Sequence, residues 1–521
     1  MIAPADLFFT DLHGEDKAFI YLLRTGCGIL RERAKECFSH RLSEDTIDRL
    51  LYLVAFPEEY SVGESEYLAH LRNLAKCFGI SSCVMSEGFV TLADNVSRAL
   101  VNKVFVLGDV WDRGPRPDKI MDEIIHRGGI RMVWGNHDIM WMGASRGSEI
   151  CCLNVLRISM RYNSFEMLTE GYGIDLEGLK EFACEVYAGD DCKSFIPRSA
   201  GEFVAPGISV SDAAKMHKAT AIIQFKLICA LMARHPEYPF EEKPFLDCLD
   251  LESGYAEYLG KRYELADKNF PTLNKSCLYQ LTDGERQVLD CLTRSFKSSK
   301  KLSEHISYIL ENGSLYHIDS NVLMYHGLLP MSDGGEFVKI GFVGNLTGRE
   351  LFDYCEKKLR EILSLEAEDE SQERFDFIEY LWQCEQSVLN GKSYHTAETF
   401  LKYFAAGERE NIERKDFYYT FIADKSADTE ILKQFGLQQD ESIILTGHMP
   451  VKSGEKPGYA GSKLLIIDGG LSRNYEKTTG KGGYVFMRRE GKHYLIEAQP
   501  YSVYSRNKVF KVETFVRELD F

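Results

Sequence analysis

Residues 104–138, VFVLGDVWDRGPRPDKIMDEIIHRGGIRMVWGNHD, decide the fold of this chain. Two apolar runs, VFVL and IRMVW, each end in a glycine followed by Asp or Asn, a pattern that predicts two buried strands. Between them, RPDKIMDEIIHRGG carries Ile120, Met121, Ile124 and Ile125 at helical spacing and ends in glycine. This order predicts a compact βαβ unit with parallel strands.

Other short apolar runs end in the same abrupt way, in Gly, Asp or His. They are DLFFTDLHG, NVLMYHG, SIILTGHMP and KLLIIDGG. Each predicts a further buried strand. Long segments with helix-like spacing and few prolines separate these strands, so we expect helical insertions into one core. The insertions are expected at 21–100, 151–320 and 346–440.

The composition is that of a folded protein. Of the 521 residues, 44% are hydrophobic and 27% are charged, which excludes wholesale disorder. The formal net charge of −17 argues against non-specific nucleic-acid binding, which a basic face usually provides. Fourteen cysteines without a C-x-x-C pair are expected to be reduced thiols.

We expect neither a signal peptide nor a membrane span, and hence a cytoplasmic protein. The N-terminal stretch MIAPADLFFTDLHGE reaches charged residues almost at once. The most apolar internal stretch, ATAIIQFKLICALMARH at 219–235, carries Lys226 in its middle and is too short to cross a bilayer. It therefore predicts a buried helix.

Polar side chains follow five of the predicted strands at the point where each strand ends. Because the carboxyl ends of strands in such sheets face one crevice, these side chains are candidates for a single site. Taken singly, an Asp after a strand is often a turn cap and a lone His is often a core or surface residue. Together, carboxylate, amide and imidazole groups suit a hard or borderline divalent metal. The residues are Asp11 and His13, Asp109, Asn136 and His137, His326, and His448.

The ordered series D-x-H-G, G-D-x-x-D-R-G, G-N-H-D, H-G and G-H-x-P resembles the metallophosphoesterase superfamily. The resemblance implies an α/β protein of the α+β sandwich type, with a calcineurin-like core of two packed β-sheets flanked by helices. On this basis the catalytic core is expected to be discontinuous, made of 1–20, 101–150, 321–345 and 441–521, with the three helical insertions between its parts.

The resemblance also implies a two-metal centre. Two cations would lower the pKa of a shared water, which is the expected nucleophile, and would clamp the phosphate oxygens. Asp11 and His13 would hold the first metal, Asp109 would bridge both, and Asn136, His326 and His448 would complete the second.

The same motifs imply three catalytic residues. His137 would protonate the leaving alkoxide, Asp112 would orient its imidazole, and Arg113 would bind the phosphoryl oxygens. A surface ion pair between Asp112 and Arg113 is the alternative. Asp138 is open between support of a metal ligand and a simple helix cap.

The core motifs also resemble serine/threonine protein phosphatases, so the flanking sequence has to indicate the substrate. The stretches GDVWDRGPRPDKIMDEI, RMVWGNHDIMWMGASRGSEICCLNVLRISMRYN, EGYGIDL and LLIIDGGLSRNYEKTTGKGGY resemble bacterial class III fructose-1,6-bisphosphatases. That family removes the 1-phosphate of fructose 1,6-bisphosphate to give fructose 6-phosphate in gluconeogenesis. The resemblance implies two divalent ions, with Mn²⁺ preferred to Mg²⁺. A protein phosphatase and an inactive scaffold are the alternatives.

A bisphosphate needs a second anion site, because the protein as a whole repels the unreacting phosphate. The first candidates lie in or near the basic, glycine-rich C-terminal stretch: Arg473, Lys477, Lys481 and Lys452. Arg157 and Arg161, one helical turn apart, are the second. Family members carry a sizeable segment before D-x-H-G, whereas Asp11 comes early here. We expect the metal site to be independent of that segment, and leave homo-oligomer formation open.

Overall fold

The computed structural model describes most of the chain, with short gaps. The described residues are 3–38, 41–198, 203–240, 244–365, 369, 371–407, 409–423, 427–458, 462–500, 502–504 and 509–519. All candidate site residues lie within these ranges.

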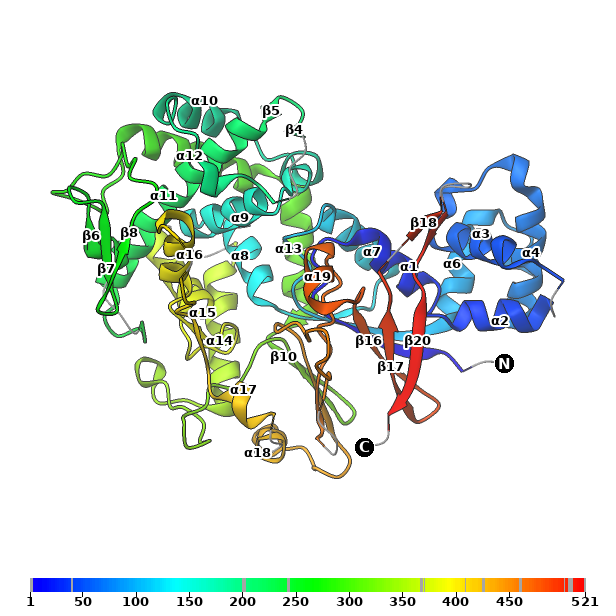
Figure 1. Ribbon diagram of the computed structural model, residues 1–521. Helices are drawn as coiled ribbons and strands as arrows, with labels where there is room; N and C mark the ends of the chain where they lie inside the picture. Colours follow the sequence, from blue (N-terminus) through cyan, green and yellow to red (C-terminus); the bar gives the residue numbers. More distant parts are fainter. Residues whose placement is uncertain are drawn as a thin grey trace.

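A seven-stranded mixed sheet forms the centre of the molecule (Figure 1). Its order is β20-β17-β16-β1-β2-β3-β9, parallel from β1 to β9 and antiparallel from β1 to β20. The strands are β1 (Ala5–Phe9), β2 (Val101–Leu107), β3 (Arg131–Val133), β9 (Gly313–Ser314), β16 (Tyr484–Arg489), β17 (Lys492–Ala498) and β20 (Thr514–Leu519).

A second sheet of four strands packs against the first. Its order is β10-β11-β14-β15, with β11, β14 and β15 parallel. The strands are β10 (Tyr316–Asp319), β11 (Val322–Tyr325), β14 (Ile443–Thr446) and β15 (Leu464–Ile466). One buried cluster joins the sheets: Phe8, Phe105 and Phe486 from the first meet Met324, Ile443 and Leu445 from the second. The core between them is therefore that of a sheet-on-sheet sandwich.

All six predicted strands are present. Helix α7 (Pro117–Arg127) joins parallel strands β2 and β3, which confirms the βαβ unit. Pro117 opens this helix, where a missing N–H costs nothing, and Gly128 ends it with a φ of 65°. Ile120, Met121 and Ile124 of the predicted apolar stripe are buried and face the core, whereas Ile125, the fourth residue of the stripe, is 38% exposed. The six strands do not form the crevice of a single sheet, because three of them belong to each of the two sheets.

Helices flank the sandwich on both sides (Figure 1). Those between β1 and β2 lie on one side: α1 (Asp16–Arg24), α2 (Ile29–Phe38), α3 (Glu44–Ala55), α4 (Ser65–Cys77), α5 (Ser82–Met85) and α6 (Phe89–Leu100). Those on the other side include α8 (Asn136–Ser145), α9 (Glu149–Arg161), α10 (Glu177–Val186), α11 (Val210–Arg234), α12 (Asp283–Ser298), α13 (Lys300–Asn312), α14 (Gly348–Leu363), α15 (Asp376–Gln383) and α16 (His395–Phe404). The segment 151–320 is not purely helical, since it also supplies β9, β10 and several short hairpin strands.

Helix α11 is long and apolar enough to cross a membrane by composition alone, but 78% of its most apolar window is buried inside the protein. Lys226 in its middle has no exposed side-chain surface. Its Nζ donates to Glu285 Oε2 and to the Thr272 carbonyl, each at 2.7 Å. The helix is therefore a core helix, as the sequence predicted.

The buried Lys226–Glu285 pair gives a stability prediction. Glu285→Ala leaves the ammonium group of Lys226 buried without a counter-charge, so we expect the free energy of unfolding to fall by about 3–5 kcal/mol. Denaturant unfolding followed by circular dichroism measures it. Glu410→Ala, which breaks an exposed pair with Lys261, is the control and should change little. Equal unfolding midpoints for the two variants would contradict the prediction.

Candidate active site

The predicted polar residues converge where the carboxyl ends of strands from both sheets meet. Asp11 and His13 follow β1, Asp109 follows β2, Asn136 and His137 follow β3, His326 follows β11, and His448 follows β14. All but His448 are buried, with exposed fractions of 6% or less. Two sheets therefore supply one cluster of carboxylate, amide and imidazole groups.

The loops that hold this cluster are strained. Positive φ angles occur at Asp11 (49°), His13 (43°), Asp109 (57°), Asp112 (69°), Arg113 (69°) and His448 (70°). Such angles are uncommon for residues with a side chain and persist where surrounding structure enforces them, often at functional sites. Gly135 and Gly447 allow the close packing, because a Cβ there would collide with the carboxylates of Asp109 and Asp11, respectively.

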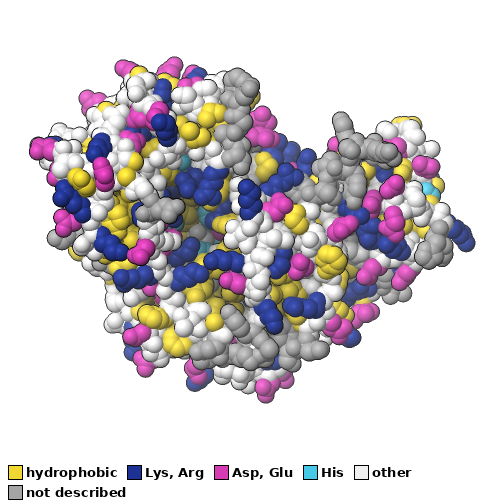
Figure 2. All heavy atoms as spheres, in the orientation of Figure 1, with side chains coloured by type: hydrophobic (Ala, Val, Ile, Leu, Met, Phe, Trp, Pro, Cys, Tyr) yellow, Lys and Arg dark blue, Asp and Glu magenta, His cyan; other side chains and the backbone are white. Residues whose placement is uncertain are grey.

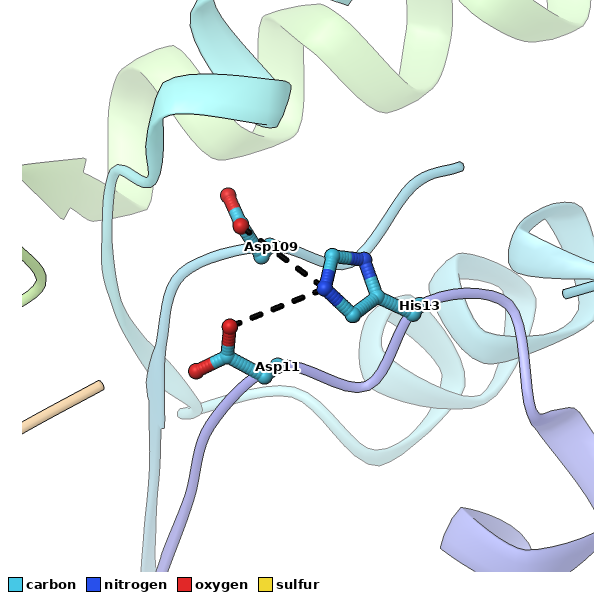
Figure 3. A group of neighbouring side chains, drawn as sticks. All are labelled: Asp11, His13 and Asp109. Carbon is cyan, nitrogen blue, oxygen red and sulfur yellow. Dashed lines mark ion pairs between the residues drawn. The ribbon is translucent and has the colours of Figure 1, made fainter. Parts of the chain in front are cut away.

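Asp11, His13 and Asp109 form one group of converging donor atoms (Figure 3). His13 Nε2 lies 3.6 Å from Asp11 Oδ1 and 3.8 Å from Asp109 Oδ2. His13 Nδ1 lies 2.9 Å from the Trp111 carbonyl, which turns Nε2 toward the carboxylates. Burial and the nearby Arg113 hold the pKa of His13 well below its usual value. The imidazole is therefore neutral, as a metal ligand must be.

A second group shares Asp109. Its Oδ2 lies 3.3 Å from His326 Nε2, while Asn136 Oδ1 lies 3.2 Å from His326 Nε2 and 2.9 Å from His448 Nδ1. Neighbouring ligands of an ion with bonds of about 2.0–2.1 Å are separated by roughly 3 Å, so these spacings fit a metal. The outer nitrogens of His326 and His448 contact the backbone carbonyls of Leu107 and Asn390, at 2.7 and 2.8 Å. Each ring is thus oriented with one nitrogen toward the cluster.

The cluster generates a strong negative field. Burial alone would lower the pKa of His326, but the carboxylates of Asp109 and Asp11 raise it to about 10. Burial would raise the pKa of Asp109, yet His326 and His137 hold it well below its usual value. Both shifts show that the centre of the cluster favours positive charge. Its donor set and field therefore fit a divalent cation, and the buried group of Asp11, His13 and Asp109 could hold one.

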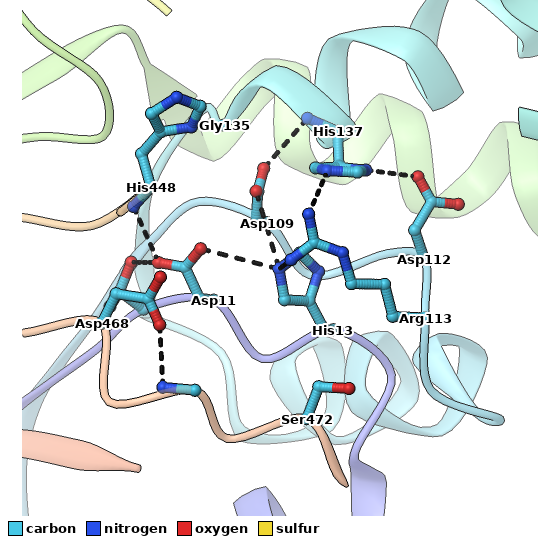
Figure 4. Close-up of polar contacts among 12 residues, drawn as sticks. Asp11, His13, Asp109, Asp112, Arg113, Gly135, His137, His448, Asp468 and Ser472 are labelled. Atoms are coloured by element: carbon cyan, nitrogen blue, oxygen red, sulfur yellow. Dashed lines mark hydrogen bonds and ion pairs between the residues drawn. The ribbon is translucent and has the colours of Figure 1, made fainter. Parts of the chain in front are cut away.

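His137 is fixed beside the cluster rather than within it (Figure 4). Its Nδ1 lies 2.6 Å from Asp112 Oδ2, and Trp141 Nε1 donates to the other oxygen of Asp112 at 2.9 Å. Trp382 packs edge-on against the His137 ring, with centroids 5.2 Å apart. These contacts leave Nε2 as the nitrogen that faces the site. Asp112 therefore orients a histidine instead of forming an ion pair with Arg113.

Arg113 lies between the two histidines of this face. Its Nη1 lies 2.7 Å from His13 Nε2 and its Nη2 lies 3.0 Å from His137 Nε2. The guanidinium carbon lies 4.8 Å from the centre of the Tyr475 ring. Ser164 and Asn474 both donate to the Arg113 carbonyl at 3.0 Å, which fixes its backbone.

Asp138 serves both roles that the sequence left open. It caps helix α8 by accepting from the Gly135 N–H at 2.8 Å. It also accepts from the N–H groups of Asp109 and Val110, each at 2.9 Å. Asp138 thus ties the end of β2 to the start of α8 and holds the backbone of Asp109 in place.

A cavity of about 550 Å³ opens beside the cluster, and Asn136, His137 and His448 line it. Nine Lys or Arg side chains line the same cavity, against two Glu, in a protein with a net charge of −17. Figure 2 shows Lys and Arg side chains gathered around this hollow. The cavity is therefore an anion-attracting site within an acidic protein.

Three of the six predicted substrate-binding residues line the cavity: Arg157, Arg161 and Lys452. The structure does not bring Arg473, Lys477 or Lys481 to the lining that it describes. The backbone N–H of Arg473 instead donates to Glu15, and Lys481 Nζ contacts the Tyr484 hydroxyl. Proximity in sequence to the LLIIDGG strand did not place these three side chains in the cavity.

Several contributors to the site were not predicted. Asp468 follows β15 and is 1% exposed. Its Oδ1 accepts from Gly470 N–H at 2.9 Å, and its Oδ2 has no hydrogen-bond partner among the described residues. The strand-end rule that selected Asp109 would have selected Asp468 too. Trp382 and Asn390 lie in the insertion 346–440, where no local sequence signal marks them.

The two packed sheets, the buried donor cluster and the cation-lined cavity define the class of protein, a hydrolase of phosphoric monoesters. The particular family follows from comparison with known proteins. The model of the Firmicute fructose-1,6-bisphosphatase family matches residues 3–78 and 79–516, and the chain belongs to this family.

Similar curated proteins include the "Fructose-1,6-bisphosphatase class 3" of Clostridioides difficile, which is 33% identical over 95% of this chain and 83% of that protein. Proteins of the same name from Clostridium acetobutylicum and Listeria innocua are 33% and 31% identical, over 92% and 97% of this chain and 81% and 86% of their own lengths. No solved structure gives a significant match.

Proposed function

We propose that this chain, a class 3 fructose-1,6-bisphosphatase, uses the cluster described above to hydrolyse fructose 1,6-bisphosphate to fructose 6-phosphate and phosphate. This reaction is a step of gluconeogenesis and takes place in the cytoplasm. The observation that carries the proposal is the convergence of two donor groups that share Asp109, beside a cavity rich in cations. The core is accordingly assigned to the metallophosphoesterase fold.

Asp11, His13 and Asp109 would hold one divalent ion, and Asp109, Asn136, His326 and His448 would hold the other. Three imidazoles and an amide among the ligands favour Mn²⁺ over Mg²⁺, which prefers an all-oxygen shell. When bound, the two ions activate water at neutral pH and neutralise charge on the phosphoryl group.

Arg113 positions the phosphoryl group. In the structure its Nη1 uses the lone pair of His13 Nε2, the same lone pair that a cation would use. Only one of them can occupy it, so with a cation held by His13, Nη1 would be left to donate to a phosphoryl oxygen. Protonated Nε2 of His137 cannot accept from Nη2, which lies 3.0 Å away, so both nitrogens would then offer the planar two-point contact that suits phosphate.

His137 donates a proton from Nε2 to the sugar oxygen that leaves. Asp112 and Trp141 hold the ring so that this nitrogen, and not Nδ1, faces the reacting group. The carboxylate of Asp112 also stabilises the protonated imidazole before the transfer. The cavity cations, including Arg157, Arg161 and Lys452, attract the rest of the substrate.

Substrate preference tests this function. Purified, Mn²⁺-loaded protein is assayed for phosphate release from fructose 1,6-bisphosphate, fructose 6-phosphate, a phosphoserine peptide and p-nitrophenyl phosphate. Because charge-assisted contacts to a second phosphate strengthen binding, we expect kcat/KM for the bisphosphate to exceed the others by about tenfold to a hundredfold or more. One phosphate should be released per molecule. Comparable turnover of the phosphopeptide would favour the protein phosphatase alternative.

A further inference from the structure

Two lysines lie directly opposite each other on a short ribbon in the wall of the cavity. Strand β12 (Lys392–Ser393) pairs with β13 (Arg414–Lys415), and the register places Lys392 opposite Lys415. Both residues line the cavity. Like charges directly opposite on neighbouring strands are destabilising, so the fold gains nothing from this arrangement by itself.

Neither ammonium group has a direct hydrogen-bond or ion-pair partner in the part of the chain that the structure describes. Nζ of Lys415 only lies 5.7 Å from the Tyr419 ring centre. Lys402 in the same cavity differs, because its Nζ lies 3.2 Å from Glu398 Oε1. Glu413, whose carboxylate acts on both lysines, is held by His395 Nδ1 at 3.0 Å.

The charges that surround the two lysines are mostly positive. Burial lowers the pKa of Lys392, Glu413 raises it, and Arg113, Lys415 and Lys402 lower it further. Burial also lowers the pKa of Lys415, and Lys452 adds to this effect while Glu455 and Glu413 oppose it. Around the lysine pair, three further cations thus face two carboxylates, so a bound anion would offset an excess of positive charge.

The ribbon is joined rigidly to the metal-ligand cluster. The carbonyl of Asn390, two residues before Lys392, lies 2.8 Å from Nε2 of His448. The Asp416 N–H donates to the Gly391 carbonyl at 2.9 Å, and Asp416 Oδ1 accepts from Met331 and Tyr418. An anion on the ribbon would thus lie at a fixed position relative to the ligands.

We propose that Lys392 and Lys415 bind the phosphate of the substrate that is not cleaved, an inference that rests on the proposed function. A dianionic phosphate has enough oxygens to accept hydrogen bonds from both ammonium groups at once. Arg157, which also lines the cavity, is less suited because its Nε already donates to Gln224 at 2.6 Å. Arg161 and Arg198 lie over the rings of Tyr403 and Tyr162, and neither is placed opposite a second cation on a paired strand.

The lysine pair accounts for selectivity rather than for the chemical step. It binds the second phosphate equally before and during the reaction, so it lowers KM without changing kcat. A substrate whose only phosphate is the one to be cleaved, such as p-nitrophenyl phosphate, does not use the lysine pair. Fructose 6-phosphate, the product, retains the phosphate that the ribbon binds and should bind there too.

The test uses the full chain with Lys392→Met, Lys415→Met and the double variant. The matched control is Lys433→Met, at an exposed lysine that pairs with Glu430 and is not part of the described cavity lining. We expect each single substitution at the ribbon to raise KM for fructose 1,6-bisphosphate about tenfold to a hundredfold at similar kcat. The kcat/KM for p-nitrophenyl phosphate should change less than about twofold. Calorimetric binding of fructose 6-phosphate should weaken by the same factor as KM rises. Lys433→Met should leave all three quantities near the wild-type values.

Two results would overturn the inference: unchanged KM and fructose 6-phosphate affinity in the double variant, or loss of selectivity in Arg161→Ala instead. A purely structural effect would lower the melting temperature and kcat/KM for both substrates together, and this also counts against it. The direct binding measurement separates this inference from the proposed function. If wild-type protein binds fructose 6-phosphate through the lysine pair but does not hydrolyse the bisphosphate, only the function fails.

Discussion

Asp109→Asn is expected to reduce phosphate release from fructose 1,6-bisphosphate by more than ~10³-fold, because several kcal/mol of transition-state stabilisation depend on the bound cations. Asp109 is the only residue shared by the two donor groups, with its Oδ2 facing both His13 and His326. An amide keeps the shape of the carboxylate but loses the charge that would balance the two proposed cations. The metal content of the purified variant, measured by inductively coupled plasma mass spectrometry, should fall below that of the wild type.

The control for this variant is Asp353→Asn, at an exposed residue that accepts a hydrogen bond from the Tyr316 hydroxyl. It should retain both activity and metal. Melting temperatures show whether the Asp109 variant is folded, which matters because Asp109 Oδ1 also accepts from the His137 N–H at 3.0 Å. A folded Asp109→Asn enzyme with near-normal turnover would remove the two-metal assignment.

Local sequence patterns were sufficient to predict the position of those candidate site residues that follow strands. The apolar runs before Asp109 and Asn136 could only be buried strands, and the polar residue after each had to lie at a strand end. The strands that precede His326 and His448 belong to a different sheet from β1–β3, yet their carboxyl ends reach the same place. The carboxyl ends of strands thus bring the predicted polar residues together across a sandwich as well as within one sheet.

The lysine ribbon in the wall of the cavity was not predictable in the same way. Lys392 and Lys415 belong to the insertion 346–440, and the cross-strand pairing that places them together leaves no periodicity in the sequence. The sequence analysis proposed a second anion site at Arg473, Lys477 and Lys481, because these residues closely follow a core strand. In the structure, Tyr475 and Thr478 of this stretch line the cavity, Thr478 from helix α19 (Glu476–Thr479), but the three basic residues are not part of the described lining. Side-chain direction depends on how the insertions pack, which composition does not encode.

His137→Ala is expected to slow hydrolysis of fructose 1,6-bisphosphate by ~10²–10⁴-fold while the metal content stays unchanged. His137 lies outside both donor groups, and its Nδ1 is engaged by Asp112 at 2.6 Å. Removing the imidazole therefore removes the proton donor and leaves the ligands in place. The leaving sugar alkoxide is strongly basic and needs that proton. The leaving p-nitrophenolate is a much weaker base and needs it less.

The two substrates consequently separate the general-acid role from every indirect effect. If His137 is the acid, the alanine variant should lose far more activity on the sugar bisphosphate than on p-nitrophenyl phosphate. Trp141→Phe, which removes only the hydrogen bond to Asp112 Oδ1, should show the same selective loss at a smaller magnitude, since it loosens the residue that orients His137. Equal losses on both substrates together with depleted metal would instead mean that His137 supports the metal centre, and the assignment of the proton donor would then be wrong.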